Sequence, residues 1–369
     1  MHYQSNEMAK FGCPITLNIF DINFNQTQYN KMLWSLANAI AVSQDCSNVI
    51  NLAQSMKMST TNINTLKTAN CCKVVGVTCT PAGIAEEIHW ESMGLTGTIS
   101  NHFSKLSVTG FFAQNNELRG NLPAFPKTLQ YVALENNKLS GKIPAFPNIY
   151  EGYFGNNQFQ GKLAEFPSTL MYFAAQNNLL AGPIPKLPAR MLELDLQSNQ
   201  FTGGIPNLPD NLVSLTLANN ELKGKLPASL PSTLENLNLN SNAFFGQLPT
   251  VFPKSLLELN LYNNDFTGNM TELPEGLRVL NIYNNDLKGS LIVNKPVQLI
   301  ANINHFTEIV VKDQSQMVVC DLSNNPVWRS TLAPLEGNCR LYGTKKDRTD
   351  GLVKRSIEDE SELKKRSLD

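Results

Sequence analysis

The chain has 369 residues, only 17% of them are charged, and its formal net charge is -1. This balance gives no indication of a nucleic-acid partner or of adhesion to an acidic membrane. No apolar run approaches the roughly 18 to 20 residues that a membrane-spanning helix needs, and the C-terminus lacks the hydrophobic tail of a lipid anchor. We therefore expect no nucleic-acid partner and no transmembrane segment.

The first residues do not resemble a secretion signal, but a later segment does. Residues 32–43, MLWSLANAIAVS, are mostly apolar and place small residues at Ala41 and Ser43, as before a signal cleavage site. We predict that translation begins at Met32, that residues 1–31 are a doubtful extension, and that residues 32–43 form a signal peptide. The alternative is an amphipathic helix. Removing residues 1–43 discards Cys13 and leaves six cysteines, an even set.

Residues 44–83 combine a helical pattern with a cluster of cysteines. Val49, Leu52, Ala53 and Met56 fall at helical spacing, and the segment NCCKVVGVTC follows at 70–79. Three close cysteines could bind a metal, perform redox chemistry or form disulfides. Adjacent cysteines do not have the C-x-x-C spacing of a zinc knuckle, and no histidine lies nearby, so we favour disulfides over a metal site or free thiols.

An asparagine recurs every 20 to 22 residues through the middle of the chain in the pattern N-x-[L/F]-x-G. The nine in-phase asparagines, called anchors below, are Asn116, Asn137, Asn157, Asn178, Asn199, Asn220, Asn242, Asn264 and Asn285. Met93 fits one unit earlier, and Asn304 and Asn325 extend the series. The sequence therefore predicts about twelve units over residues 84–328.

One unit, LPDNLVSLTLANNELKGKLP, illustrates the physical pattern. Leu215 and Leu217 alternate with small polar residues, which predicts a short strand with leucines on its inner side. A buried anchor must have its amide hydrogen-bonded, so we expect a ladder of asparagines bonding the backbones of neighbouring units. Glycine four residues later favours a tight turn, and the prolines oppose regular helix.

This pattern resembles the leucine-rich repeat family, and the G-x-[I/L]-P ending of each unit resembles its plant-type, extracellular subclass of receptor-like ectodomains and inhibitors of cell-wall-degrading enzymes. The resemblance implies an α/β solenoid, a right-handed superhelix with a parallel concave sheet and disulfide caps. Because the F/L-P-x-x-L link is short, we expect a mostly non-helical convex side.

The resemblance also implies the cysteine pairing. It makes residues 44–83 an N-terminal cap with bonds Cys46–Cys71 and Cys72–Cys79, although Val74 stands where the family motif has tryptophan. A C-terminal cap at 329–340 would be closed by Cys320–Cys339. Disulfides indicate an oxidising compartment, hence an extracellular or cell-surface protein.

Two features remain outside the repeat pattern. Residues 341–369 are rich in charge and poor in apolar groups, which predicts a disordered tail. Asn269-Met-Thr is a glycosylation sequon that survives a start at Met32, so we expect a glycan on Asn269.

The concave face can be read from the positions six, four, two and one residues before each anchor. These positions contain no lysine or arginine, and their acidic members are Glu87, Glu91, Glu135, Glu151, Glu193, Asp195, Glu258 and Asp321. Aromatic residues occupy the same face at Phe112, Tyr131, Tyr153, Tyr172, Tyr262 and Tyr283. We expect the first four to form a stripe across adjacent strands, and exposed tyrosines are common at binding sites.

We predict a non-enzymatic recognition protein that binds a protein or peptide on this acidic, tyrosine-rich face, without a cofactor. One alternative is a carbohydrate-binding or structural surface protein, in which amides such as Gln114, Asn115 and Gln176 would bond a glycan. Another is an inhibitor of a secreted cell-wall-degrading enzyme. His89 shares a predicted strand face with Glu87 and Glu91, a trio that could bind a metal or transfer protons, but exposed polar positions explain it equally simply and we predict no catalysis.

Overall fold

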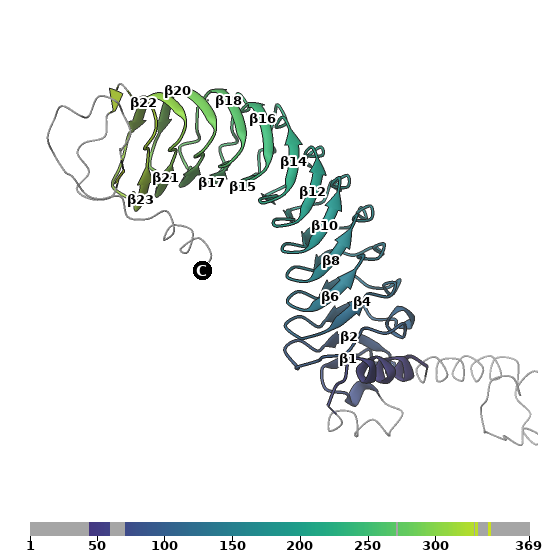
Figure 1. Ribbon diagram of the computed structural model, residues 1–369. Helices are drawn as coiled ribbons and strands as arrows, with labels where there is room; N and C mark the ends of the chain where they lie inside the picture. Colours follow the sequence, from purple (N-terminus) through teal and green to yellow (C-terminus); the bar gives the residue numbers. More distant parts are fainter. Residues whose placement is uncertain (1–43, 60–70, 271, 328, 331–338, 341–369) are drawn as a thin grey trace, which may run out of the picture.

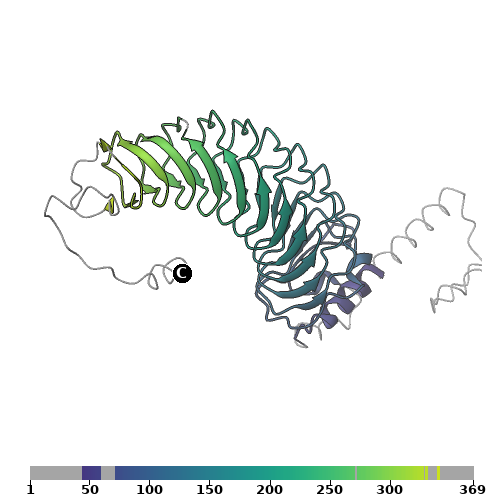
Figure 2. The same ribbon diagram turned by 45° about the horizontal axis from the view of Figure 1, so that its top comes forward.

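The computed structural model describes residues 44–59, 71–270, 272–327, 329–330 and 339–340. The doubtful extension at 1–31, the signal peptide at 32–43 and the tail at 341–369 lie outside the described residues. So does most of the C-terminal cap at 329–340. The described part of the repeat array is a curved stack of coils whose inner and outer borders are different β-sheets (Figures 1 and 2).

The inner border of the arc is a 14-stranded sheet, called the inner sheet. Strand β1 pairs antiparallel with β2, and all later neighbours are parallel. Leaving out β1 and β25, twelve strands remain, one for each predicted unit. The strands are β1 (Val77–Cys79), β2 (Ala85–His89), β3 (Gly110–Phe112), β5 (Tyr131–Ala133), β7 (Glu151–Tyr153), β9 (Tyr172–Ala174), β11 (Glu193–Asp195), β13 (Ser214–Thr216), β15 (Asn236–Asn238), β17 (Glu258–Asn260), β19 (Val279–Asn281), β21 (Gln298–Ile300), β23 (Val319–Asp321) and β25 (Cys339–Arg340).

A second sheet, called the outer sheet, has 11 parallel strands, and each strand begins shortly after an anchor or its equivalent. Its strands are β4 (Arg119–Asn121), β6 (Lys138–Gly141), β8 (Gln158–Gly161), β10 (Leu179–Gly182), β12 (Gln200–Gly203), β14 (Glu221–Gly224), β16 (Ala243–Gln247), β18 (Asp265–Asn269), β20 (Asp286–Val293), β22 (His305–Val311) and β24 (Arg329–Ser330). In Figure 1, β16, β18 and β20 follow the outer border of the arc, while β15, β17 and β21 follow the inner one.

The sequence analysis did not predict these outer strands, only a glycine turn and a convex side with little helix. In β12, Phe201 is buried between the exposed Gln200 and Thr202, which is the alternation of a half-buried strand. The glycine turn lies at the end of the strand, where Gly203 has φ 86°. The mostly non-helical convex side is confirmed, because the only helix among the described residues of the array is the short 3-10 helix η4 (Phe103–Lys105).

The predicted asparagine ladder is present and joins consecutive coils. Asn178 is 7% exposed, and its Nδ2 donates to the carbonyl of Phe154 in the preceding coil at 3.0 Å and to that of Ala175 in its own coil at 3.1 Å. Its Oδ1 accepts from the backbone N–H of Phe159 at 2.9 Å. Anchor amides therefore satisfy turn backbone groups that burial would otherwise leave unbonded.

The residue before each anchor lies in a left-handed turn, with φ between 53° and 58° from Ser92 to Asn324. We predict this position on the concave face, and the structure places it in the turn, three residues past the end of the strand. Asparagine and serine tolerate this conformation better than most residues. In the first units their amides form an exposed chain, Asn177 to Asn156 to Asn136 to Asn115, at 2.7 to 2.8 Å.

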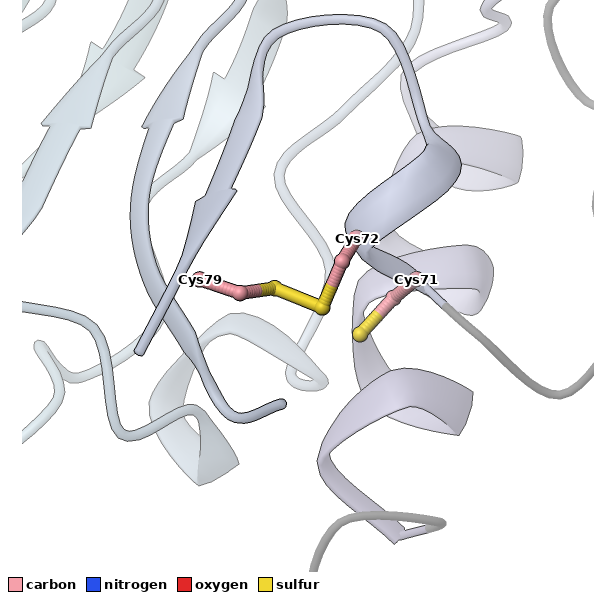
Figure 3. Close-up of side chains that lie close together, drawn as sticks. All are labelled: Cys71, Cys72 and Cys79. Atoms are coloured by element: carbon pink, nitrogen blue, oxygen red, sulfur yellow. A yellow bond between two sulfur atoms is a disulfide. The ribbon is translucent and has the colours of Figure 1, made fainter. Parts of the chain in front are cut away.

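The N-terminal cap covers the first coil with a helix over 44–55 and two disulfides. The bonds are Cys46–Cys71 and Cys72–Cys79, the pairing that the resemblance implied. Figure 3 shows Cys72 in η3 (Cys71–Lys73) bonded to Cys79 in β1, while the Cys71 sulfur points toward the helix. Because all three sulfur atoms are in disulfides, they are not available as metal ligands.

Buried side chains fix the cap to the array. Val49, Leu52, Ala53 and Met56 are completely buried, as their helical spacing predicted. The Asp45 carboxylate accepts from the backbone N–H of Ala85 at 3.1 Å and of Ser107 at 3.3 Å. Residue 74, where the family motif has tryptophan, is a buried valine, and the fully buried Trp90 donates from Nε1 to the Val75 carbonyl.

At the other end, Cys320 is disulfide-bonded, and the pairing of β23 with β25 sets it opposite Cys339. The side chain of Cys339 lies outside the described part. This backbone register is the one that the predicted Cys320–Cys339 bond requires.

Candidate functional site

The inner sheet presents three columns of side chains on its concave side. Each three-residue strand contributes its first residue to the first column and its third residue to the second, while the middle residue is buried in the core. The third column comes from the residue two positions before each anchor, just past the strand. Parallel pairing aligns equivalent residues of neighbouring coils, so each column is a continuous row about 4.8 Å per step.

All ten predicted binding residues lie in these columns and are half-buried or exposed. The first column contains Tyr131, Tyr172, Glu193 and Glu258, the second contains Phe112, Tyr153 and Asp195, and the third contains Glu135, Tyr262 and Tyr283. From β2 to β23 the columns contain no lysine or arginine, and in the backbone register Arg340 of β25 pairs with Asp321 of β23. Arg119, Lys223 and Lys288 lie instead in the outer sheet, on β4, β14 and β20. Lysine and arginine are therefore absent from the columns of β2 to β23, although the outer sheet also carries carboxylates, such as Glu221, Asp265 and Asp286.

The four aromatic rings do not form the single stripe that we predicted, because the pairing of the inner strands places them in two columns. Phe112 and Tyr153 lie in the second column with Ala133 between them, whereas Tyr131 and Tyr172 lie in the first column with Glu151 between them. The four rings zigzag between two columns. Alternation of large and small residues leaves spaces between the rings, which a sequence read one strand at a time does not reveal.

One such space is a hollow of about 160 Å³ in the middle of the concave face. Tyr153 and Tyr172 lie at one end and Glu193 and Asp195 at the other, and the small residue Ala174 lies between Tyr153 and Asp195 in the second column. Ser214 and Thr216 continue the opening on the next strand. This hollow contains four of the ten predicted residues, and the small residues that form it were missed.

The carboxylates of this region are held in a partly dehydrated environment. Burial raises the pKa of Asp195, even though its Oδ1 accepts from the Gln197 backbone N–H at 3.0 Å. Burial likewise raises the pKa of Glu135. Burial, followed by the nearby Glu151 charge, raises the pKa of Tyr153, whose hydroxyl donates to Glu151 at 3.1 Å. Among the described residues, none of the ion pairs includes Glu135, Glu193 or Asp195.

The concave face also has an excess of hydrogen-bond acceptors. Seven buried side-chain atoms of the described residues lack a partner, and six of them are oxygens in the second and third columns. They belong to Gln114, Glu135, Gln176, Asn240, Asn281 and Asn302. Unpartnered buried acceptors cost free energy, and because protein covers these oxygen atoms, a ligand on the concave face does not reach them directly.

The later tyrosines form a different arrangement. Tyr262 and Tyr283 are adjacent in the third column, with ring centroids 4.7 Å apart and planes 9° from parallel. Asn240 precedes and Asn302 follows them in the same column. The inner face of each ring is covered by the other ring, so this pair does not offer two free faces for a ligand. Burial raises the pKa of Tyr262.

The His89 trio is only partly assembled. His89 Nε2 lies 3.1 Å from a Glu87 oxygen, and the His89 ring stacks on Phe112 at 4.6 Å. Glu91 is exposed and belongs to the third column, so the three groups do not converge.

A larger hollow of about 460 Å³ lies in the later units, along the turns that join the inner and outer strands. Asp265 and Asp286 line this hollow, and Asp286 is 3.4 Å from His305.

Comparison with known proteins supports the fold. A family model described as Leucine Rich Repeat matches residues 190–212 and 211–232. No curated protein matches the sequence. No helix in the described part of the chain is both long and apolar enough to cross a membrane.

Three solved structures illustrate the likeness. The Arabidopsis receptor kinase HAESA, solved with the peptide hormone IDA and the co-receptor SERK1, is 23% identical with a TM-score of 0.59, covering 76% of this chain and 58% of that chain. A plant ice-binding protein is 22% identical with a TM-score of 0.55, covering 67% and 88%. The plant peptide hormone receptor RGFR1, solved with RGF2, is 19% identical with a TM-score of 0.50, covering 65% and 51%. The chain thus spans little more than half the length of the two receptors. The family model thus matches two of the twelve units, and the coils of the array have the fold of a leucine-rich repeat solenoid.

Proposed function

We propose that this protein binds a peptide or protein partner outside the cell, through the concave face of its earlier units. The observation that carries the proposal is the placement of charge: from β3 to β23 the concave columns carry carboxylates and tyrosines and no lysine, arginine or histidine. Such a face attracts a basic partner electrostatically, and tyrosines are frequent energetic centres of interfaces.

The structural neighbours support the same class of ligand. HAESA and RGFR1 were both solved with peptide hormones, and their coils resemble those of this chain. The disulfides of the N-terminal cap favour an oxidising compartment, which agrees with an extracellular site of action. Asn269 is exposed on β18 of the outer sheet, so a glycan on its side chain would leave the concave face open.

The experiment is a capture of partners from the secreted fraction, with the secreted protein as bait, crosslinking and mass spectrometry. The double variant Tyr153→Ala with Tyr172→Ala is the matched negative bait. We expect at least one protein or peptide to be captured by the wild type and lost with the variant, and its binding to weaken as ionic strength rises. A partner retained equally by both baits and insensitive to salt would contradict the proposed site.

A further inference from the structure

We propose that the hollow between Tyr153, Tyr172, Glu193 and Asp195, called the central hollow, binds the guanidinium group of one arginine side chain of the partner. This inference rests on the proposed function and names the chemical group that the same site selects. It depends on the shape of the hollow, the chemistry of its walls and the hydrogen-bonding state of its carboxylates.

The shape limits the ligand to a single side chain. Ligand pockets for drug-sized molecules are about 300 to 1,000 Å³, whereas the central hollow is about 160 Å³. It exists because Ala174 separates Tyr153 from Asp195 along the second column. Two steps along a parallel sheet are about 9.6 Å at 4.8 Å each, which leaves room for a planar group between the tyrosine and the carboxylate.

The walls match a planar cation. Glu193 and Asp195 come from the first and third positions of one strand, so their carboxylates lie on the same side of the sheet. Tyr172 is the neighbour of Glu193 in the first column, and Tyr153 lies beyond Ala174 in the second. Arginine both stacks on aromatic rings and bonds carboxylates through several N–H groups, which lysine does less well.

The free protein leaves these groups without a cation. The Asp195 carboxylate accepts two hydrogen bonds, both from Gln197: one from its backbone N–H at 3.0 Å and one from its Nε2 at 3.4 Å. No ion pair among the described residues includes Glu193 or Asp195. A partly buried carboxylate without a cation is costly, and an incoming guanidinium would offset that cost.

The test uses small probes on the intact secreted protein, with tyrosine ring signals followed by NMR. The probes are N-acetyl-arginine amide, the corresponding citrulline amide, which has nearly the same shape without charge, and the lysine amide. We expect the arginine probe to shift the Tyr153 and Tyr172 signals saturably. The citrulline probe should bind at least about tenfold more weakly, and the lysine probe should be weaker than arginine.

Variants locate the site. Asp195→Asn should weaken binding of the arginine probe at least about tenfold, whereas Glu221→Gln, at an exposed carboxylate on β14 of the outer sheet, should leave its binding unchanged. Retention of tyrosine ring signals at their wild-type positions shows that a variant has folded. Equal binding of arginine and citrulline, equal loss with both variants, or no saturable shift would overturn the assignment.

The outcomes also separate this inference from the proposed function. If a captured partner requires Tyr153 and Tyr172 but binds Asp195→Asn normally, the concave face is the interface and the arginine site is wrong. If no partner is captured while the arginine probe binds and loses affinity in Asp195→Asn, the hollow is assigned correctly and the proposed function fails.

Discussion

The earlier and later units share one coil geometry but differ in both core and surface. From β3 to β11 the core contains many phenylalanines, and the ring of Phe173 alone lies within 6 Å of Phe146, Phe154 and Phe166. From β13 to β21 the middle residue of every inner strand is a buried leucine, such as Leu215 or Leu237, and the later phenylalanines, such as Phe244 and Phe266, lie on the outer strands. The parallel register is the same throughout.

The concave columns change at about the same place. The earlier units carry most of the tyrosines and carboxylates. The later ones add asparagines at 236, 238, 240, 260 and 281 and still carry Glu258, Tyr262 and Tyr283. The outer strands also lengthen, from three residues in β4 to eight in β20. Core packing and column composition therefore vary independently of the coil, whose shape is kept by the anchors and turns. This separation of scaffold from surface is what allows a binding face to occupy only part of the array.

The largest expected effect tests the difference between the two cores. Phe173→Ala in β9 should lower the free energy of unfolding by about 3 to 5 kcal/mol, because the ring is 1% exposed and its removal opens a cavity among three other rings. Leu237→Ala, also 1% exposed at the same position of β15, is the matched change.

Urea denaturation with hydrogen exchange measures both variants. We expect Leu237→Ala to cost less than Phe173→Ala, and exchange to increase mainly in coils next to each mutation, since each coil contacts chiefly its neighbours. Equal costs with uniform exchange would mean that the phenylalanine cluster adds no local stability.

The next effect separates the two groups of tyrosines in binding. Tyr172→Ala should weaken the binding of a captured partner by about 2 kcal/mol or more, as expected for a tyrosine at the centre of an interface. Tyr283→Ala should change the affinity little, because its ring is stacked on Tyr262 within the later units. Isothermal titration calorimetry with the purified partner compares the two, and a larger loss for Tyr283→Ala would move the interface to the later units.

A smaller, stabilising effect is expected in the later units, where the left-handed turn position is not occupied by asparagine or serine in every coil. Ile303 has φ 53° and is 45% exposed, although β-branched residues are disfavoured in this conformation. Ile303→Asn should raise the free energy of unfolding by about 1 kcal/mol by relieving this strain. Asn284→Ile, the same exchange in reverse one coil earlier at the same φ, should lower it. Thermal melts check the opposite signs.

These contrasts show how far the sequence could specify the structure. The anchors predicted the coils, the number of units and the asparagine ladder, because a buried amide must be hydrogen-bonded. The N-terminal cap was predicted from the helical spacing of its apolar residues and from the family resemblance. Outer strands were harder to predict, since Gln200-Phe201-Thr202 before a glycine is compatible with both a turn and a strand. Only the pairing with neighbouring coils decides between them.

The candidate site was predictable as a list of residues but not as a shape. Tyr153, Tyr172, Glu193 and Asp195 were all assigned to the concave face from their distance to the anchors. The hollow between them depends on Ala174, a residue with no polar group that attracts no attention when each strand is read alone. Reading residues down the columns, with the register known, reveals it.

The smallest expected effect concerns pH and tests whether the earlier concave face is dehydrated. Burial raises the pKa of Asp195 from its ordinary value of 3.8, so over the range just above that value the folded state binds more protons than the unfolded state. The free energy of unfolding contributed by this group therefore falls as pH rises through that range. Asp195→Asn removes the contribution, so the difference in stability between variant and wild type should shift in favour of the variant from about pH 4 to about pH 7. Urea denaturation at both pH values measures this shift. A difference independent of pH would mean that Asp195 is fully hydrated, and the attraction of a cation to the central hollow would then be weaker than its burial suggests.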